Sequence, residues 1–387
     1  MSLYLLAARR LQGVKTGGKF RSQYVTICST GARGKYQRRS KAPGLQEEEE
    51  GKEDKRRSSR LEEGRNIPLF VTSDHHFSKA SLNLKQTHLD TMAALSLRLP
   101  SLEDGDPWIV HQKLFDVLNE YLQPSSSTGS PSAAKVIDSL TPNKRQGLDP
   151  SDDAKPKEEC ESFLLETWGT FIEIARQIPS EHASQDRLVD LVKALSELPS
   201  TSAEIWGSTM QVWTDLPLLG PSMREAWIPP TGAHGKSLSP NDAQRWINQN
   251  AFAARLLNLE KVSWSNFAVW SLRAALEEKP STSAESYNCD VAAAAQWILH
   301  SGSYLLKEVK SDADKEIQEQ EEDEGEAKPN RGQPLAAGSL YKGKGKARLC
   351  PERWQFWKQQ FGEITQQGAE ENVKSIAQQA KEKMDSV

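Results

Sequence analysis

The stretch WTDLPLLGPSMREAW (residues 213–227) contains the side chains of this sequence that could most readily do chemistry. A corner set by Pro217 and Gly220 separates Asp215 from Arg224. Such a corner could present the carboxylate and the guanidinium into a cleft as a charge-assisted pair. In the alternative interpretation, which we favour, Asp215 caps a turn and Arg224 donates hydrogen bonds to exposed backbone carbonyls.

His300 occupies a position that suggests a second chemical role, because it lies in a charge-free stretch (residues 291–306), four residues after Gln296. A histidine that acts as a general base needs an orienting carboxylate, and a metal-binding histidine needs partner ligands at short spacing. None of the other six histidines is placed to form a helical pair with it. We therefore interpret His300 as a satisfied histidine of the core or of an interface.

Tryptophan is unusually frequent, and ten of the eleven tryptophans lie between residues 168 and 357. One interpretation is a pocket or groove lined with indole rings, which would accept a flat ligand or a partner helix. The candidates for that speculative pocket are Trp213, Asp215, Arg224 and His300. The interpretation that we favour is that the indoles fill wide gaps between helices, since most occupy core positions of their helices.

Patterns typical of catalytic or metal sites are missing from the sequence. Cys28, Cys160, Cys289 and Cys350 lie more than 60 residues apart, so no pair has the spacing of a zinc or redox site. The stretch GSLYKGKG (338–345) is similar to a phosphate-binding loop, but a glycine replaces the hydroxyl that would hold Mg²⁺, so we expect a basic linker. Basic and aromatic residues are not interleaved as in nucleic-acid-binding proteins. The sequence therefore predicts no catalytic, metal-binding or cofactor-binding residue, no cofactor and no nucleic-acid partner, and it does not favour an enzyme.

The composition indicates that the packed part is smaller than the whole chain. The chain has 387 residues, a net charge of −4 and 37% hydrophobic residues. Even with its 24 glycines added, the apolar share stays below the ~45–50% of ordinary globular domains. No stretch reaches the ~18–20 apolar residues needed to cross a bilayer. We therefore expect no membrane span and an intracellular, most simply cytoplasmic, protein.

Charge is distributed unevenly along the chain. Residues 1–46 contain ten Lys and Arg and no acid, whereas residues 312–326 contain nine carboxylates and one lysine. Like-charge blocks repel and stay solvated, so we expect both to be tails or linkers. The first residues also have the basic amphipathic character of a mitochondrial presequence, which keeps a mitochondrial location open. A disordered basic arm and a start codon assigned too far upstream are the alternatives.

Helical spacing of apolar residues dominates the rest of the sequence. It predicts helices at 108–122, 160–178, 186–198, 241–259 and 262–278, and from residues 290 and 351 onward. The same spacing continues through Trp206, Met210 and Trp213. Alternating strand patterns with Asn-Gly or Asp-Gly turns are missing. The fold class that follows is all-α, with a single discontinuous helical-bundle domain and long disordered insertions.

The domain boundaries follow from these patterns. Residues 1–77 are expected to form a disordered extension, basic at first and then of mixed charge. The all-α core comprises 78–309 and 350–384, interrupted by a disordered insertion at 123–157. Residues 310–349 form a linker that is acidic and then rich in Gly and Lys.

Six sequence blocks point to a family. They are FIEIARQIPSEHASQDRLVDLVKALSELP (171–199), VWTDLPLLGPSMREAW, NQNAFAARLL, AVWSLRAALEE, VAAAAQWILH and PERWQFWKQQF. In order and spacing they resemble a fungal family known as domain of unknown function 3632, over roughly residues 106–384. The resemblance implies a mostly helical protein from a fungus. It implies no functional residue, because the family has no assigned activity.

Two functions fit these observations. We favour a non-enzymatic protein-binding or scaffold module whose Trp-rich helical core holds a partner helix in an aromatic groove. The alternative is an enzyme or carrier for a small apolar metabolite in a Trp-lined pocket. The expected partner is accordingly another protein or a small apolar ligand.

Overall fold

The computed structural model describes residues 93–103, 107–145, 159–230, 237–280, 283–320, 335–343, 348–366 and 370–387. All of them belong to one compact unit, residues 71–387. The basic N-terminal extension, with the presequence interpretation that rests on it, lies outside the described residues.

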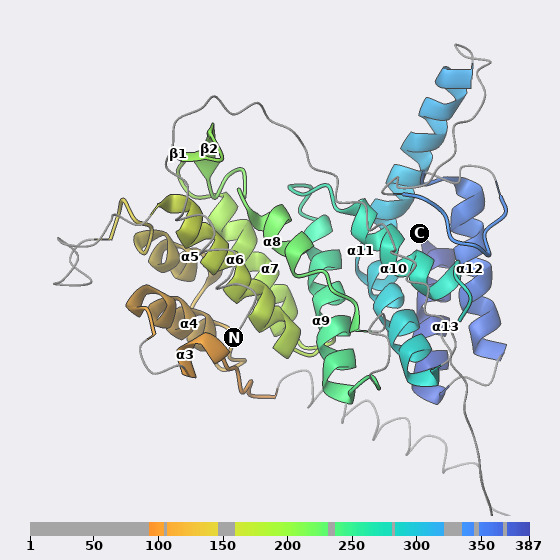
Figure 1. Cartoon of the computed structure of the whole chain (residues 1–387), viewed down its shortest axis with the longest axis horizontal. Helices are drawn as coiled ribbons and strands as arrows, with labels where there is room; N and C mark the ends of the chain where they lie inside the picture. Colours follow the sequence, from red (N-terminus) through yellow and green to blue (C-terminus); the bar gives the residue numbers. More distant parts are fainter. Residues whose placement is uncertain are drawn as a thin grey trace, which may run out of the picture. The chain divides into compact units, whose positions relative to one another are not determined.

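Eleven α-helices and one two-stranded hairpin make up the described part of the chain (Figure 1). The first helices are α3 (Pro100–Glu103), α4 (Ile109–Tyr121), α5 (Ser130–Ser139), α6 (Cys160–Gln177) and α7 (Ser184–Ser196). The hairpin follows, with β1 (Thr201–Ile205) and β2 (Ser208–Val212). The remaining helices are α8 (Leu219–Glu225), α9 (Pro240–Leu257), α10 (Ser265–Leu276), α11 (Ala284–Gln320), α12 (Pro351–Gln366) and α13 (Glu371–Ser386). The fold class is all-α, as predicted.

Helix α9 connects two groups of helices. On one side it packs against α6 and α7, which contact α4, α5 and α8, and on the other side it packs against α11. Helix α11 in turn contacts α10, α12 and α13. A continuous hydrophobic core runs through both groups, and Trp168, Trp213, Trp297 and Trp357 are among its largest fully buried side chains. These four indoles fill gaps between helices, as we favoured from the sequence.

The start of α9 shows how local sequence sets a helix boundary. Ser239 Oγ accepts a hydrogen bond from the backbone N–H of Asp242 at 3.0 Å, and Pro240 occupies the first helical position. A serine cap satisfies an N–H group that has no partner inside the helix, and a proline at the first position has no N–H to leave unpaired. This predicted start is confirmed.

The predicted disordered insertion at 123–157 is wrong for its first half. Residues 130–139 form α5, and Ala133, Ala134 and Ile137 are fully buried against the core. Ser130 and Pro131 open this helix, where proline is favoured, so serine and proline here indicate a helix start rather than a flexible loop. Residues 146–158 lie outside the described part.

The predicted linker at 310–349 also contains ordered structure. Helix α11 continues to Gln320. Residues 335–343 pack beside the end of α10, where the backbone N–H of Leu340 donates to the backbone oxygen of Glu277 at 2.7 Å. The similarity of GSLYKGKG to a phosphate-binding loop therefore carries no function here, because Gly338 and Tyr341 of this segment are part of a packed contact.

A buried ion pair, which we call the Glu277–Arg353 hub, holds this segment in place. Arg353 Nε donates to Glu277 Oε1 at 2.6 Å, and both side chains are fully buried. The same carboxylate accepts from Trp357 Nε1 at 2.6 Å and from the backbone N–H of Gly338 at 2.7 Å. Arg353 also donates to the backbone oxygen of Leu335 at 2.7 Å. The hub thus joins α10, residues 335–343 and α12 by hydrogen bonds that leave the charges paired.

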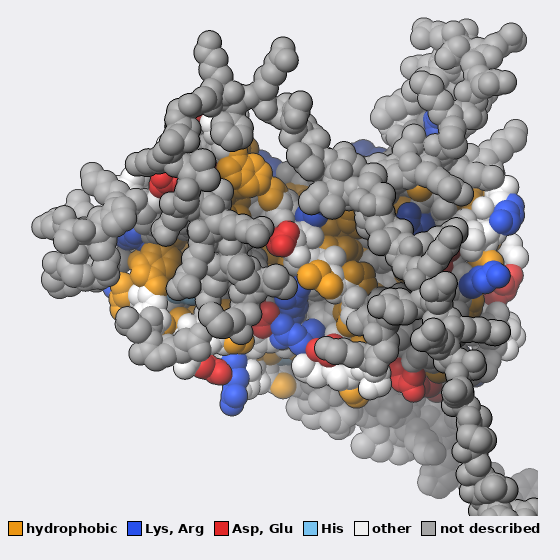
Figure 2. All heavy atoms as spheres, viewed as in Figure 1, with side chains coloured by type: hydrophobic (Ala, Val, Ile, Leu, Met, Phe, Trp, Pro, Cys, Tyr) orange, Lys and Arg blue, Asp and Glu red, His pale blue; other side chains and the backbone are white. Residues whose placement is uncertain are grey.

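The surface of the described part holds few exposed large hydrophobic side chains. They are Trp108, Ile109, Val136, Trp206, Ile228 and Leu340. On the face drawn in Figure 2, hydrophobic side chains that are not covered by grey atoms reach the surface in separate places rather than along one groove. Among the described helices, none is sufficiently long and apolar to pass through a bilayer.

Candidate functional site

The hairpin between α7 and α8 is the least expected element of the fold. The sequence pattern predicted a continued helix through Trp206, Met210 and Trp213, but residues 201–212 pair as antiparallel strands, with Ile205 opposite Ser208. Trp206 and Gly207 form the two-residue turn, with φ of 51° and 74°. Positive φ at both central residues is what a type I′ hairpin turn requires. Glycine adopts this conformation freely, whereas a tryptophan there is strained.

Two features distinguish Trp206 at the tip of the hairpin: its backbone is fixed by a hydrogen bond, and the residue is exposed. Its backbone N–H donates to Glu161 Oε1 at 2.7 Å, and Glu161 lies in the first turn of α6. The residue is 64% exposed, which is more than any other described tryptophan. A strained backbone that is fixed by a neighbouring helix and carries an exposed aromatic ring is typical of a functional position.

The other face of the hairpin is anchored in the core. Ile205 and Val212 are buried, and Trp213 follows β2 with a φ of 69° and a fully buried indole. This indole contacts Phe163 and Trp168 of α6 edge-on, with ring centroids 6.2 and 5.8 Å away. The base of the hairpin is therefore rigidly attached to α6, and the tip extends from that base.

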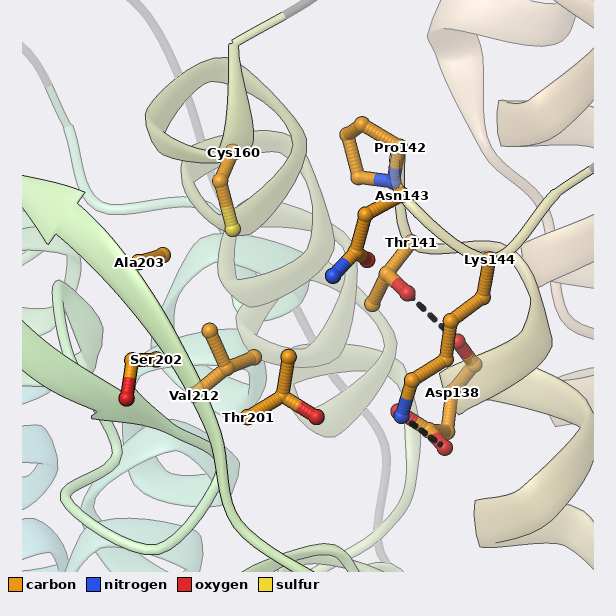
Figure 3. Close-up of a pocket in the computed structure, with 10 residues that line it drawn as sticks. All are labelled: Asp138, Thr141, Pro142, Asn143, Lys144, Cys160, Thr201, Ser202, Ala203 and Val212. Carbon is orange, nitrogen blue, oxygen red and sulfur yellow. Dashed lines mark hydrogen bonds and ion pairs between the residues drawn. The ribbon is translucent and has the colours of Figure 1, made fainter.

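A cavity of about 240 Å³ lies between the hairpin, the end of α5 and the start of α6 (Figure 3). Lys144 Nζ donates to both carboxylate oxygens of Asp138 at 2.8 Å, and Asp138 Oδ1 also accepts from Trp213 Nε1 at 2.9 Å. The thiol of Cys160 and the amide of Asn143 point into the space between α6 and β1. The complete lining is Asp138, Thr141, Pro142, Asn143, Lys144, Cys160, Thr201, Ser202, Ala203 and Val212.

The four residues proposed from sequence for a pocket each have a separate environment. Trp213 is bonded to Asp138, as described above. Asp215 is exposed and accepts from the backbone N–H of Gln211 at 2.8 Å, which is the turn-capping role that we favoured. The guanidinium of Arg224 lies over the ring of Trp270, 5.4 Å from its centroid. None of the four lines the described cavity beside the hairpin.

His300 is the fourth of these residues, and it forms a local contact within α11. Its Nε2 lies 3.1 Å from Gln296 Oε1, and its backbone oxygen accepts from Asn258 Nδ2 at 2.6 Å beside a kink at Ser301. Burial, and secondarily the positive charge of Arg255, lower the pKa of His300 to about 3. The imidazole is therefore neutral at physiological pH and satisfied within its own helix.

The described residues contain no group of three or more His, Cys, Asp or Glu side chains arranged to hold a metal ion. The feature of the candidate site that could not be recognised from the sequence is the pair formed by Trp206 and Glu161. The available signal was the alternation of Thr201, Ala203 and Ile205 with polar residues, followed by a glycine at 207. That alternation spans only five residues, and the turn lacks the Asn-Gly or Asp-Gly pair that marks most such hairpins.

Comparison with known proteins identifies a family. A family model described as "Protein of unknown function (DUF3632)" matches residues 168–361, a range that contains Trp206 as well as Glu277 and Arg353. No curated protein and no solved structure matches the chain significantly. The fungal source implied by the resemblance stays a prediction. Because the match spans half of the chain, in a helical fold with the expected blocks, the protein belongs to the DUF3632 family.

Proposed function

We propose that this protein is a non-enzymatic protein-binding or scaffold module that engages its partner through the tip of the β1–β2 hairpin. The observation that carries the proposal is the 64% exposure of Trp206, which lies on a turn with a φ of 51°. Exposed aromatic anchors contribute much of the binding energy in protein interfaces. In this proposal the partner contacts a projecting indole ring, and not the aromatic groove that we expected from the sequence.

The rigid attachment of the hairpin supports this function. The bond from the Trp206 N–H to Glu161 and the buried Trp213 at the base restrict the position of the tip. An anchor that is ordered before binding loses little conformational entropy when the partner arrives. The strain of the turn is already present in the free protein, so it lowers the stability of the fold and does not lower the affinity for the partner.

The variant Trp206→Asn tests the proposal. Asparagine tolerates positive φ and keeps the backbone N–H that bonds to Glu161, so the hairpin should stay intact while the aromatic ring is removed. The matched control is Ile228→Ser, which removes an even more exposed hydrophobic side chain (73%) elsewhere on the surface.

We would purify tagged wild-type protein and both variants from the source cells and weigh the complexes by native mass spectrometry. The proposal expects a protein-sized addition for wild type and Ile228→Ser that is lost in Trp206→Asn. An addition retained by all three proteins, or an addition of only a few hundred daltons, would contradict it.

The alternative function, an enzyme or carrier for a small apolar metabolite, receives less support. It requires a Trp-lined pocket, and no tryptophan lines the described cavity beside the hairpin. The cavity also contains the Asp138–Lys144 ion pair, which suits a polar ligand better than an apolar one. His300, which that alternative would use as a polar group, makes a hydrogen-bond contact within its own helix.

A further inference from the structure

Two other exposed or partly exposed indoles, those of Trp108 and Trp270, are each covered by an arginine. Arg145 lies 5.3 Å from the ring centroid of Trp108, and Arg224 lies 5.4 Å from that of Trp270. A guanidinium over an indole face gains cation–π attraction and shields the ring from water. Among the described residues, no Lys or Arg occupies the corresponding position over Trp206, although this residue is 64% exposed and Trp108 only 37%.

Two carboxylates accompany the uncovered ring. Glu161 uses one oxygen to accept the Trp206 N–H at 2.7 Å, which leaves its second oxygen available. Glu204 lies two residues before Trp206, on the exposed side of β1, and accepts a hydrogen bond from Thr209 Oγ1. In the part of the chain that the structure describes, neither carboxylate forms an ion pair with Lys, Arg or His. The tip therefore combines an aromatic face with unneutralised negative charge.

We infer that the hairpin tip binds an arginine side chain of the partner protein, with the guanidinium stacked on Trp206 and paired with Glu161 and Glu204. This inference rests on the proposed function, whose partner it describes chemically. Arginine fits better than lysine because its planar guanidinium stacks on an indole, donates in pairs to carboxylates and is more weakly hydrated than an ammonium group. The partner's arginine would cover the indole of Trp206 across the interface, as Arg145 and Arg224 cover indoles within the chain.

The test uses the full chain labelled with ¹⁵N in its tryptophan indoles, and Trp206→Phe assigns the Trp206 indole resonance. The probe is the peptide acetyl-Gly-Gly-Arg-Gly-Gly-amide, with matched peptides that carry citrulline or lysine in place of arginine. Citrulline has nearly the shape of arginine without its charge. The indole of Trp270 is an internal control, because Arg224 already covers it.

We expect the arginine peptide to shift the Trp206 resonance toward saturation, with a dissociation constant in the millimolar range. The citrulline peptide should give no comparable shift, the lysine peptide a smaller one, and Trp270 should stay unchanged. Glu161→Gln keeps an oxygen that accepts the Trp206 N–H but removes the charge, so it should weaken binding about threefold, as expected for an exposed ion pair. Glu260→Gln, at an exposed carboxylate elsewhere, should have no effect.

Three results would overturn the inference: an equal shift with citrulline, an equal shift with lysine, or unchanged affinity in Glu161→Gln. The outcome is separable from that of the proposed function. If Trp206→Asn abolishes the complex with the partner but the peptides show no dependence on charge, the protein-binding function stands and the arginine assignment fails. If the arginine peptide binds as expected but the complex survives Trp206→Asn, the protein-binding function at this tip fails.

Discussion

The hairpin tip and the Glu277–Arg353 hub both combine a carboxylate with an indole, but among the described residues only the hub adds a cation. In the hub, Glu277 accepts hydrogen bonds from a backbone N–H, from the indole of Trp357 and from Arg353, whose guanidinium lies 5.3 Å from the ring centroid of Trp357. At the tip, Glu161 accepts a backbone N–H beside the exposed indole of Trp206.

The origin of the cation decides whether each site can bind a ligand. In the hub the arginine comes from α12 of the same chain, so the charges are paired and both side chains are fully buried. Such a site contributes to the fold and has no group left for a ligand. At the tip no described cation is supplied by the chain, so the ring and the carboxylates remain accessible to a partner. The following predictions test this contrast between a closed and an open site.

The largest effect is expected when the hub loses its cation. Arg353→Met leaves Glu277 buried without a counter-charge, which should lower the free energy of unfolding by about 3–5 kcal/mol. Urea denaturation followed by circular dichroism measures the change. The control Lys307→Met removes one partner of an exposed pair, with side chains 72% and 62% exposed, and should change stability by less than about 0.5 kcal/mol. Equal effects of the two substitutions would remove the distinction between the hub and an ordinary surface pair.

The second largest effect on stability is expected at Gly338, where the backbone passes close to Glu277. A Cβ atom at Gly338 would lie 2.5 Å from the backbone oxygen of Glu277, so Gly338→Ala must displace the segment from α10. We expect a loss of about 3 kcal/mol, at the upper end of the usual cost of overpacking. Gly362→Ala is the matched control, because its Cβ would meet only Lys381 at 3.5 Å and alanine favours the helix. Thermal unfolding should show opposite shifts for these two variants.

A pH-dependent prediction concerns His300, a site that is also satisfied within the chain. Burial lowers its pKa to about 3 in the folded protein, against 6.5 for an unperturbed histidine. As the pH falls below 6.5, His300 therefore becomes protonated in the unfolded chain but stays neutral in the folded protein. Stability is unaffected by this group above that pH and should decrease by about 2 kcal/mol between pH 7 and pH 5.

The variant His300→Gln isolates this contribution. Its free energy of unfolding should depend less steeply on pH over the same interval than that of the wild type, as urea titrations at several pH values would reveal. Identical slopes for the two proteins would mean that the pKa of His300 is the same in the folded and unfolded states. His111, whose pKa burial also lowers, should contribute with the same sign in both proteins.

The smallest effect on stability is expected at the open site, and its sign is opposite. Trp206→Asn relieves positive φ at a bulky residue, so the free energy of unfolding should rise by about 1 kcal/mol. The same variant should no longer bind the partner, which would show that Trp206 lowers the stability of the fold but is needed for binding. A decrease in stability on thermal unfolding would instead indicate that the Trp206 ring packs against the fold.

Much of the fold could be predicted from sequence. Apolar residues at helical spacing gave the predicted helices at 160–178 and 186–198, which correspond to α6 and α7. Helix α5 was missed because it buries only three residues, Ala133, Ala134 and Ile137, and because Ser and Pro are prominent in the sequence around them. The hairpin was missed because its alternating pattern spans only five residues and its Trp-Gly turn lacks the usual Asn-Gly or Asp-Gly pair.

The candidate site could be predicted only in part. Asp215 was correctly interpreted as capping a turn, since its carboxylate bonds to a backbone N–H four residues earlier in the chain. The pairs that define the two compared sites lie far apart in sequence. Trp206 and Glu161 are 45 residues apart, and Arg353 and Glu277 are 76 residues apart. No spacing rule connects such residues, because their meeting depends on how whole helices pack.

Local sequence is sufficient to predict the all-α class, the start of α9, the burial of most tryptophans and membership of the family. These properties depend on local periodicity, on capping residues and on composition, all of which act over a few turns of chain. The packing of the helices, by contrast, leaves Trp206 exposed while Trp213, seven residues later, is fully buried. Each of the two tryptophans directly follows a β-branched apolar residue, Ile205 or Val212. The physical difference is that α5 and α6 pack around Trp213, through Asp138, Phe163 and Trp168, whereas α6 reaches Trp206 through a single hydrogen bond to its backbone.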